Sequence, residues 1–470
     1  MFEGLEDEVL SKIYIDSIIY IIGVTIGLIL IFKRYRSYLR YYLIFFLIIT
    51  FSGFNIFIKP VQDFNIPIPR TVIYYLKIIS SASLYDIYIF GAFLFILFKY
   101  LKQKRNPFRK NDFLSLLYLR DIIIFIIGIL GSILYQKYGG EVEWSVINRQ
   151  LRGMLTGLVV LYSVQKVITN ITDESDMYKL LNTLSVLTLI NIISEIISAM
   201  ILRGITWERG GHSIFMIDSV NTYLLMIYGA ILFVNSKWNN KLFKFTGLLI
   251  VILLILDFYK ITYLQLGLTI AIFVFAAVVG FSVLPRRIAL VFPLFIIGFS
   301  IFLMQLFAPN TTNTVALQTR AGQLDGVFEA FDKNPQNILI GIGPGGLFKK
   351  QTLTEDGGEI KAIEIENTKF ANLQYAFQVP FFFQIKQAGI IGGILTIAFF
   401  IMQMRRGFKL IKIHWYLACL MFIIAITCLT SEGISYPDPQ VAVYYGMAYL
   451  FLTFNIKIYL QKARPNVVAL

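Results

Sequence analysis

The chain has 470 residues, of which 57% are hydrophobic, 16% are aromatic and only 15% are charged. Soluble domains carry about 25% charged residues, so this composition excludes an ordinary soluble protein and indicates an integral membrane protein. The net charge of +14 does not indicate nucleic-acid binding, because the basic residues separate apolar runs instead of clustering together.

Apolar runs recur along the whole chain. They are about 16 to 22 residues long, enough to cross a hydrocarbon core of about 30 Å as helices. The acidic opening "MFEGLEDEVLSK" lacks the features of a cleaved signal peptide, so we expect the first run to be retained. The expected fold is a single all-α membrane domain, 1–470, with about 13 (12–14) membrane-spanning helices. Their expected positions are 13–32, 41–58, 75–98, 121–135, 153–167, 180–201, 214–234, 245–258, 265–284, 288–308, 387–404, 414–430 and 441–457.

The charge of the connections predicts the topology. Basic connections alternate along the chain, at 33–40, 99–110, 235–244, 285–287, 405–412 and 457–464. The positive-inside rule places these in the cytoplasm. The acidic N-terminus and connections 59–74, 136–152, 202–213, 259–264, 309–386 and 431–440 then lie outside. The N-terminus is therefore predicted outside and the C-terminus inside.

The outside connection 309–386 is far longer than the others. Connections above about 15 residues are usually functional or disordered. Its stretch "TRAGQLDGVFEAFDKNP" predicts an amphipathic helix over 318–333. The expected apolar stripe consists of Leu324, Val327, Phe328 and Phe331.

Arg320 lies one turn before Leu324, on the stripe side of this predicted helix. A guanidinium in this position needs an anion. That anion is an acid of the same connection, a lipid headgroup or a substrate phosphate, which arginine binds through its planar, permanently charged fork.

The glycine-rich segment "NILIGIGPGGLFKK" follows the predicted helix. It lacks the Gly-Lys-Ser/Thr ending of a P-loop and the spacing of a dinucleotide fingerprint. We predict a structural turn in which Pro344 fixes one backbone angle and Gly345 and Gly346 adopt positive φ, with direct ligand contact as the alternative. Lys349 and Lys350 are expected at headgroups or at an anionic glycan.

The next stretch, "ENTKFANLQYAFQVPFFF", predicts one helical face formed by Glu366, Lys369, Phe370, Leu373 and Phe377. Glu366 is a candidate general base close to the bilayer, where partial desolvation raises the proton affinity of a carboxylate. A salt bridge to Lys369 is the alternative role. The phenyl groups of 381–383 either stack on sugars or belong to an interfacial aromatic belt.

Acidic residues inside spans are functional candidates by default. The candidates are Asp86, Glu195 and Asp257. Asp257 lies close to Lys260 and is expected to pair with it, whereas the other two serve either helix–helix hydrogen bonding or substrate. No histidine and carboxylate cluster has metal-ligand spacing, so we expect neither a metal nor a cofactor.

The order of these parts resembles the Wzy-type O-antigen polymerases and the related O-antigen ligases. The resemblance rests on about a dozen spans, one large outside loop, Arg320 at the head of its helix, "NP…GIGPGGLF", and "QAGIIGG" leading into the next span. Motif support covers roughly residues 200 to 400. The resemblance implies a metal-independent, GT-C-like membrane glycosyltransferase at the outer face of the bacterial cytoplasmic (inner) membrane.

The same resemblance implies the ligands. Glycans on undecaprenyl diphosphate act as donor and acceptor, membrane lipids surround the protein, and a chain-length regulator protein is a candidate partner. Two arginines of the family cradle the diphosphate. Arg320 matches one, and either Arg203 or Arg209 in "LRGITWERGGHSI" matches the other. Where the family has a serine-arginine pair, Lys260 and Gln265 stand here.

One departure separates polymerase from ligase. Ligases carry a histidine in the long loop, whereas residues 309–386 contain none and "ENTKF" stands in its place. Glu366, with Asn367 and Lys369, therefore occupies the acceptor segment, and His212 is the histidine beside the arginine-bearing loop. This favours a polymerase. The alternatives are the ligase, a lipid-linked oligosaccharide flippase or transporter, and the peptidoglycan glycosyltransferases of shape and division proteins.

Overall fold

The computed structural model describes ten stretches of the chain together with scattered residues within 40–44, 175–197, 241–249 and 445–456. The stretches are 7–34, 77–79, 82–103, 113–170, 206–209, 212–215, 311–349, 373–374, 380–411 and 415–430. The predicted spans 265–284 and 288–308 lie outside the described residues, as does 216–234, whereas residues 214–215, predicted to open the span 214–234, belong to the strand His212–Phe215.

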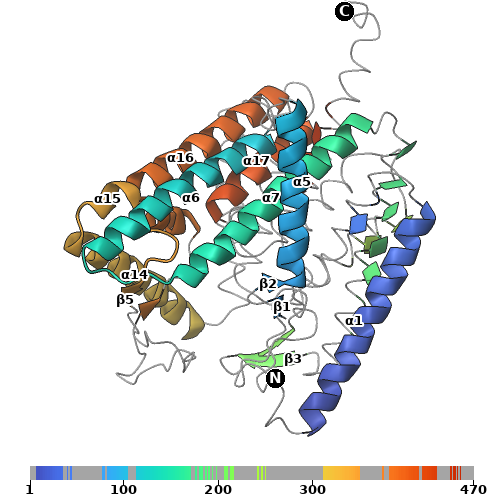
Figure 1. Ribbon diagram of the computed structural model, residues 1–470, viewed down its shortest axis with the longest axis horizontal. Coiled ribbons are helices and arrows are strands. Elements are labelled where there is room, and N and C mark those ends of the chain that lie inside the picture. The colour runs from blue at the N-terminus through green and yellow to red at the C-terminus, as the bar shows by residue number, and fades with distance from the viewer. Residues whose placement is uncertain are drawn as a thin grey trace, which may run out of the picture.

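The described part is mostly helical, and Figure 1 shows α5, α6, α7, α16 and α17 grouped together, with α1 apart from them. The helices are α1 (Asp7–Arg34), α5 (Leu84–Gln103), α6 (Phe113–Lys137), α7 (Trp144–Asn170), α14 (Thr311–Lys333), α15 (Asn337–Ile340), α16 (Pro380–Ile411) and α17 (Trp415–Thr430). The short strands are β1 (Lys77–Ile79), β2 (Ala82–Ser83), β3 (Thr206–Arg209), β4 (His212–Phe215), β5 (Phe348–Lys349) and β6 (Leu373–Gln374). They form three antiparallel pairs: β1 with β2, β3 with β4, and β5 with β6.

Among the described residues, three helices are long and apolar enough to cross a membrane. They run over Phe113–Lys137, Trp144–Thr169 and Phe381–Ile411. A helix rises about 1.5 Å per residue, so each exceeds the thickness of a hydrocarbon core. The protein is therefore a helical membrane protein, as its composition predicts.

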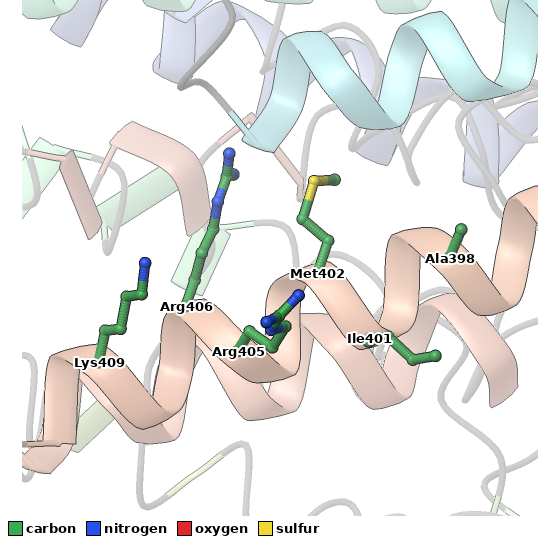
Figure 2. Close-up of a pocket in the computed structure, with 6 residues that line it drawn as sticks. All are labelled: Ala398, Ile401, Met402, Arg405, Arg406 and Lys409. Carbon is green, nitrogen blue, oxygen red and sulfur yellow. The ribbon is translucent and has the colours of Figure 1, made fainter.

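Helix α16 is the longest of these helices and is kinked. Its φ/ψ angles leave the helical region at Ala388 and Gly389, and Gly389 has a φ of +61°. The kink falls where the sequence predicts the span to begin, at residue 387, so the helical turns from Pro380 precede the expected span. The C-terminal half ends on a cationic surface that includes Arg405, Arg406 and Lys409 (Figure 2).

Helix α6 begins at Phe113, well before the predicted start at 121. It packs against α7 and α16, and α16 packs against α17. Figure 1 shows α6, α16 and α17 side by side, with α14, α15 and β5 grouped at one end of them. This end includes the connection between α6 and α7, because that connection pairs with the glycine segment through Val142 and Gly346. Two connections predicted on the same side of the membrane therefore lie together.

Candidate functional site

The glycine-rich segment is a buried turn against the ends of α6 and α16. Each residue from Gly341 to Phe348 is buried. The amide of Ile342 donates to the carbonyl of Lys386 at 2.9 Å, and the amide of Leu347 donates to Glu141 at 2.9 Å. Since these amides are already bonded to protein carbonyls, they do not form a phosphate cradle, and the segment acts as a structural turn.

A face of small residues on α6 receives this turn. A Cβ added to Gly131 would lie 2.5 Å from the carbonyl oxygen of Gly341, so only glycine permits this approach. The side-chain amide of Asn337 donates to the backbone carbonyl of Gly131 at 3.0 Å and to that of Gly341 at 2.5 Å. The hydroxyl of Ser132 donates to Ile342 at 3.4 Å. Helix α6 thus fixes the turn by both shape and hydrogen bonds.

The positive φ angles lie earlier in the turn than the sequence predicts. They occur at Gly341 (φ +78°) and Gly343 (φ +82°), whereas Gly345 and Gly346 are not among the positive-φ glycines of the described chain. The prediction was wrong about the role of the last two glycines. Added side chains there would collide with the carbonyls of Glu143 and Ile342, so Gly345 and Gly346 provide room for neighbouring backbone.

Helix α14 packs its C-terminal half on the turn. Val327, Ala330 and Phe331 are buried in one cluster with Ile342 and Phe348. The helix ends where the amide of Asn334 donates to the carbonyls of Ala330 and Phe331, both at 3.1 Å. The predicted helix exists, although it begins at Thr311 and not at 318.

The apolar stripe of α14 is rotated from its predicted position. Phe328 was expected on the stripe but is 52% exposed. Gly326 lies directly against β5, so a Cβ added there would collide with the carbonyl oxygen of Lys349. The backbone of β5 therefore approaches α14 at its smallest residue, and this contact, rather than phenyl burial, sets the orientation of the helix.

The pairing of β5 with β6 closes the segment between them. Phe348 lies opposite Gln374, and Lys349 lies opposite Leu373. Residues 350–372 therefore leave and return at one point. The expectation that Leu373 lies on a helical face with Glu366 was wrong, because Leu373 belongs to a strand that uses its backbone for pairing with β5.

Lys386 lies at the centre of this junction and was missed by the sequence reasoning. Its side chain is fully buried, and its Nζ donates to the carbonyl of Pro344 at 2.8 Å. The nitrogen also lies 5.9 Å from the centroid of the Phe383 ring. The signal in the sequence was a lone lysine between an aromatic cluster and "QAGIIGG", in a stretch otherwise poor in charge.

Several buried polar atoms of α15 and of the first turns of α16 have no hydrogen-bond partner. Within the described part, they include Oε1 of Gln384, Nε2 of Gln387 and Oδ1 of Asn337. Both glutamine residues are buried, at the last turns of α16 before its kink. Buried polar groups normally have partners, so this junction concentrates unsatisfied hydrogen-bonding capacity.

Asp86, a predicted intramembrane candidate, forms an ion pair between α5 and α7. Nη2 of Arg152 donates to its Oδ2 at 2.9 Å, and Nε of Arg152 lies 2.5 Å from its Oδ1. Both side chains are about one-quarter exposed, at 24% and 25%. This geometry supports the helix–helix role of Asp86 over direct substrate contact.

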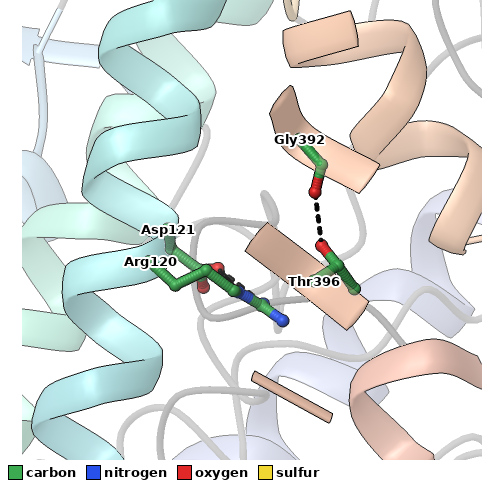
Figure 3. Close-up of polar contacts among 4 residues, drawn as sticks. All are labelled: Arg120, Asp121, Gly392 and Thr396. Carbon is green, nitrogen blue, oxygen red and sulfur yellow. Dashed lines mark hydrogen bonds and ion pairs between the residues drawn. The ribbon is translucent and has the colours of Figure 1, made fainter. Parts of the chain in front are cut away.

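A second ion pair is buried between α6 and α16. Nε and Nη2 of Arg120 donate to Oδ1 of Asp121 at 2.9 and 2.6 Å (Figure 3). The guanidinium also lies 5.2 Å from the centroid of the Phe399 ring. On the facing helix, the hydroxyl of Thr396 donates to the carbonyl of Gly392 within α16. Because Arg120 and Asp121 neutralise each other, both charges fit within α6, and the helix begins before the predicted start at 121.

The predicted diphosphate arginines are only partly described. Arg320 lies in α14, and Arg209 lies in β3 directly opposite His212 in β4. The two strands flank a Gly-Gly pair, a hairpin signal that the sequence carried but the prediction did not use. The remaining predicted site residues lie outside the described residues: Arg203, Lys260, Gln265, Glu366, Asn367 and Lys369. The acids Glu195 and Asp257 also lie outside them.

On the exposed side of α14, a neighbouring lysine lowers the pKa of Glu329. The hydrogen bond from Lys333 to Glu329, at 2.7 Å, lowers the pKa of Glu329, and the charges of Lys333 and Lys349 lower it further. Glu329 therefore stays ionised at acidic pH. Glu329 thus interacts with two ammonium groups, those of Lys333 on α14 and Lys349 on β5.

Comparisons of this chain with protein-family models, with curated proteins and with solved structures found no match.

Proposed function

We propose that this protein is a polymerase that joins oligosaccharide repeat units carried on undecaprenyl diphosphate into a surface polysaccharide of the O-antigen type. A hydroxyl group of the acceptor glycan attacks the anomeric carbon of the donor. The new glycosidic bond forms as the bond to the diphosphate breaks, the hydroxyl proton leaves, and undecaprenyl diphosphate departs with the electron pair.

The proposal includes the surroundings of the reaction. The chain has about 13 spans in a GT-C-like arrangement and lies in the bacterial inner membrane. Its N-terminus is outside and its C-terminus is cytoplasmic. The reaction takes place at the outer face, where connection 309–386 meets the ends of α6 and α16.

The contact of β5 with both α14 and β6 is the observation that carries the proposal. Helix α14 bears Arg320 and touches β5 at Gly326. Strand β6, which pairs with β5, ends the segment that bears Glu366. One short strand therefore ties together the helix with the proposed phosphate-binding arginine and the segment with the proposed acceptor residues.

Chain lengths are compatible with one reaction centre. Along a helix, Gly326 and Arg320 are separated by about 9 Å. From Leu373, an extended chain reaches Glu366 within at most about 25 Å. These lengths allow both groups to reach one region beside β5, as the proposal requires of a phosphate-binding cation and an acceptor base that act on one donor.

The proposed chemistry needs mainly positioning and positive charge. Undecaprenyl diphosphate is a good leaving group, so holding two lipid-linked glycans in line and stabilising the departing diphosphate supply most of the acceleration. Arg320, Arg209 or Arg203, and Lys260 provide that charge in the proposal. Glu366 accepts the hydroxyl proton, which contributes about 10²-fold or more.

The test uses purified full-length protein with a lipid-linked repeat unit. The expected product is a ladder of longer glycans on the same lipid, which disappears in Arg320→Ala. Lys333→Ala removes the same charge from the exposed end of the same helix and should leave the ladder intact. An unchanged ladder in Arg320→Ala would overturn the arginine assignment.

The same assay separates the alternatives. An O-antigen ligase extends nothing on undecaprenyl diphosphate but transfers the glycan to added lipid A core. A flippase or transporter moves the lipid across a vesicle membrane without lengthening its glycan. Single variants Arg203→Ala and Arg209→Ala then identify the second diphosphate arginine, because only the contacting residue should abolish the ladder.

A further inference from the structure

A cavity of about 600 Å³ lies against the C-terminal half of α16, away from the glycine-rich turn. Ala398, Ile401 and Met402 line its apolar part, and Arg405, Arg406 and Lys409 line the rest. We call these six residues the α16 pocket. Figure 2 shows the apolar side chains followed along the helix by the three cationic ones.

Helical spacing explains why these residues gather. Ala398, Met402, Arg405 and Lys409 follow one another at the three- and four-residue intervals of one helical face. The sequence changes from apolar to basic along that face at the predicted cytoplasmic end of the helix. The pocket is therefore amphipathic along its length, with its charge at the membrane border.

The charge of the pocket has one sign. Its lining includes three cations, and none of its described lining residues is acidic. Nη1 of Arg406 also donates to Oε1 of the buried Gln403 at 3.4 Å, and this contact holds one nitrogen of the guanidinium against α16. Arg405 and Lys409 are exposed. The lining thus brings three positive groups to one end of the pocket.

The apolar part decides which anion fits. A free phosphate would use the cations but leave the surface of Ala398, Ile401 and Met402 uncovered. The helical distance from Ala398 to Lys409 is about 16 Å, so a phosphate and an acyl chain can occupy the two parts together. Basic pockets at the cytoplasmic side of membrane helices bind anionic lipid headgroups in this way.

We propose that the α16 pocket binds an anionic phospholipid. Its phosphate lies among Arg405, Arg406 and Lys409, and an acyl chain covers Ala398, Ile401 and Met402. This site lies at the end of α16 opposite Lys386 and the glycine-rich turn, and it is independent of the proposed glycosyl transfer.

Native mass spectrometry of the purified full chain tests this site. Phosphatidylglycerol and phosphatidylcholine with the same acyl chains are added separately to delipidated protein in a neutral detergent. About tenfold tighter binding of phosphatidylglycerol is expected, because each nearby cation strengthens attraction to an anionic lipid. The double variant Arg405→Gln with Lys409→Gln should bind both lipids equally.

The double variant Lys99→Gln with Lys102→Gln is the matched control, since it removes two charges from the corresponding end of α5. It should retain the preference, and all variants should show wild-type helical content by circular dichroism. Equal binding of both lipids to the wild type, or equal loss in the control variant, would overturn the proposal. Displacement of the lipid by millimolar inorganic phosphate would identify a phosphate site and overturn it as well.

Discussion

The buried Nζ of Lys386 donates a hydrogen bond of 2.8 Å to the carbonyl oxygen of Pro344 and so joins α16 to the glycine-rich turn. Lys386→Ala should lower the free energy of unfolding by about 2–5 kcal/mol, because it leaves a cavity in place of the buried stem. Lys386→Met keeps that stem and should cost less than about 1.5 kcal/mol, since removal of the buried polar nitrogen offsets the lost hydrogen bond. Thermal unfolding in detergent measures both. Equal losses in the two variants would show that the bond dominates over packing.

The left-handed backbone of Gly343 provides a second prediction. Its φ is +82°, and an added Cβ would overlap Oγ of Ser132 and the carbonyl of Gly128. Gly343→Ala should therefore cost about 3 kcal/mol or more, because backbone strain and steric overlap add. The melting temperature of the purified protein reports the loss.

Gly139→Ala is the matched control for that experiment. Gly139 has a similar φ of +89°, but no heavy atom lies within 4 Å of the position of an added Cβ. Its cost should be the backbone strain alone, about 1–2 kcal/mol. If both alanine variants melt together, the packing of the turn against α6 contributes nothing measurable.

The Asp86–Arg152 pair predicts energetic coupling between α5 and α7. Asp86→Asn and Arg152→Gln should each destabilise the protein, because each leaves one half-buried charge without its partner. In the double variant, part of this loss should be recovered, with a coupling energy of about 1–3 kcal/mol. Thermal unfolding of all four proteins gives the cycle. If the losses of stability are additive and Asp86→Asn alone abolishes activity, a substrate role for Asp86 is supported instead.

The lowered pKa of Glu329 predicts a dependence of stability on pH. Because the folded-state pKa lies below the ordinary value of 4.5, the carboxylate stabilises the fold above that value and loses this contribution as pH falls through the folded-state pKa. Wild-type protein should be more stable than Glu329→Gln at pH 6. Below pH 4.5, the two melting temperatures should converge. A constant difference across this range would contradict the Lys333 interaction as its cause.

The long outside connection was partly predictable from the sequence. Periodicity around Val327 and Phe331 located α14, and the absence of P-loop spacing identified a turn. The exposure of Phe328 was not predictable, because the orientation of α14 depends on the approach of Lys349 to Gly326, which is distant in sequence. Hydrophobic periodicity locates a helix, whereas the shape of its partner decides which residues of a broad apolar face are covered.

The charged groups of the helices were the least predictable part. A hydropathy average counts each charged residue as unfavourable by itself, so it placed the start of the span after Arg120. In the structure, Arg120 and Asp121 form an ion pair inside α6 and neutralise each other. Lys386 was overlooked for a related reason. Its partner is the backbone carbonyl of Pro344, and the pattern of side chains in a sequence does not indicate which backbone carbonyl a lysine contacts.

The opposition of Lys349 and Leu373 has an evolutionary consequence. Because residues 350–372 begin and end at neighbouring positions of one small antiparallel pair, this segment is an exchangeable cassette. Its length and composition can vary without moving α14, the turn or α16, since loop closure costs rise only slowly with length. If the chain is the proposed polymerase, recognition of a new acceptor glycan requires replacement of this cassette alone, with the membrane scaffold inherited unchanged.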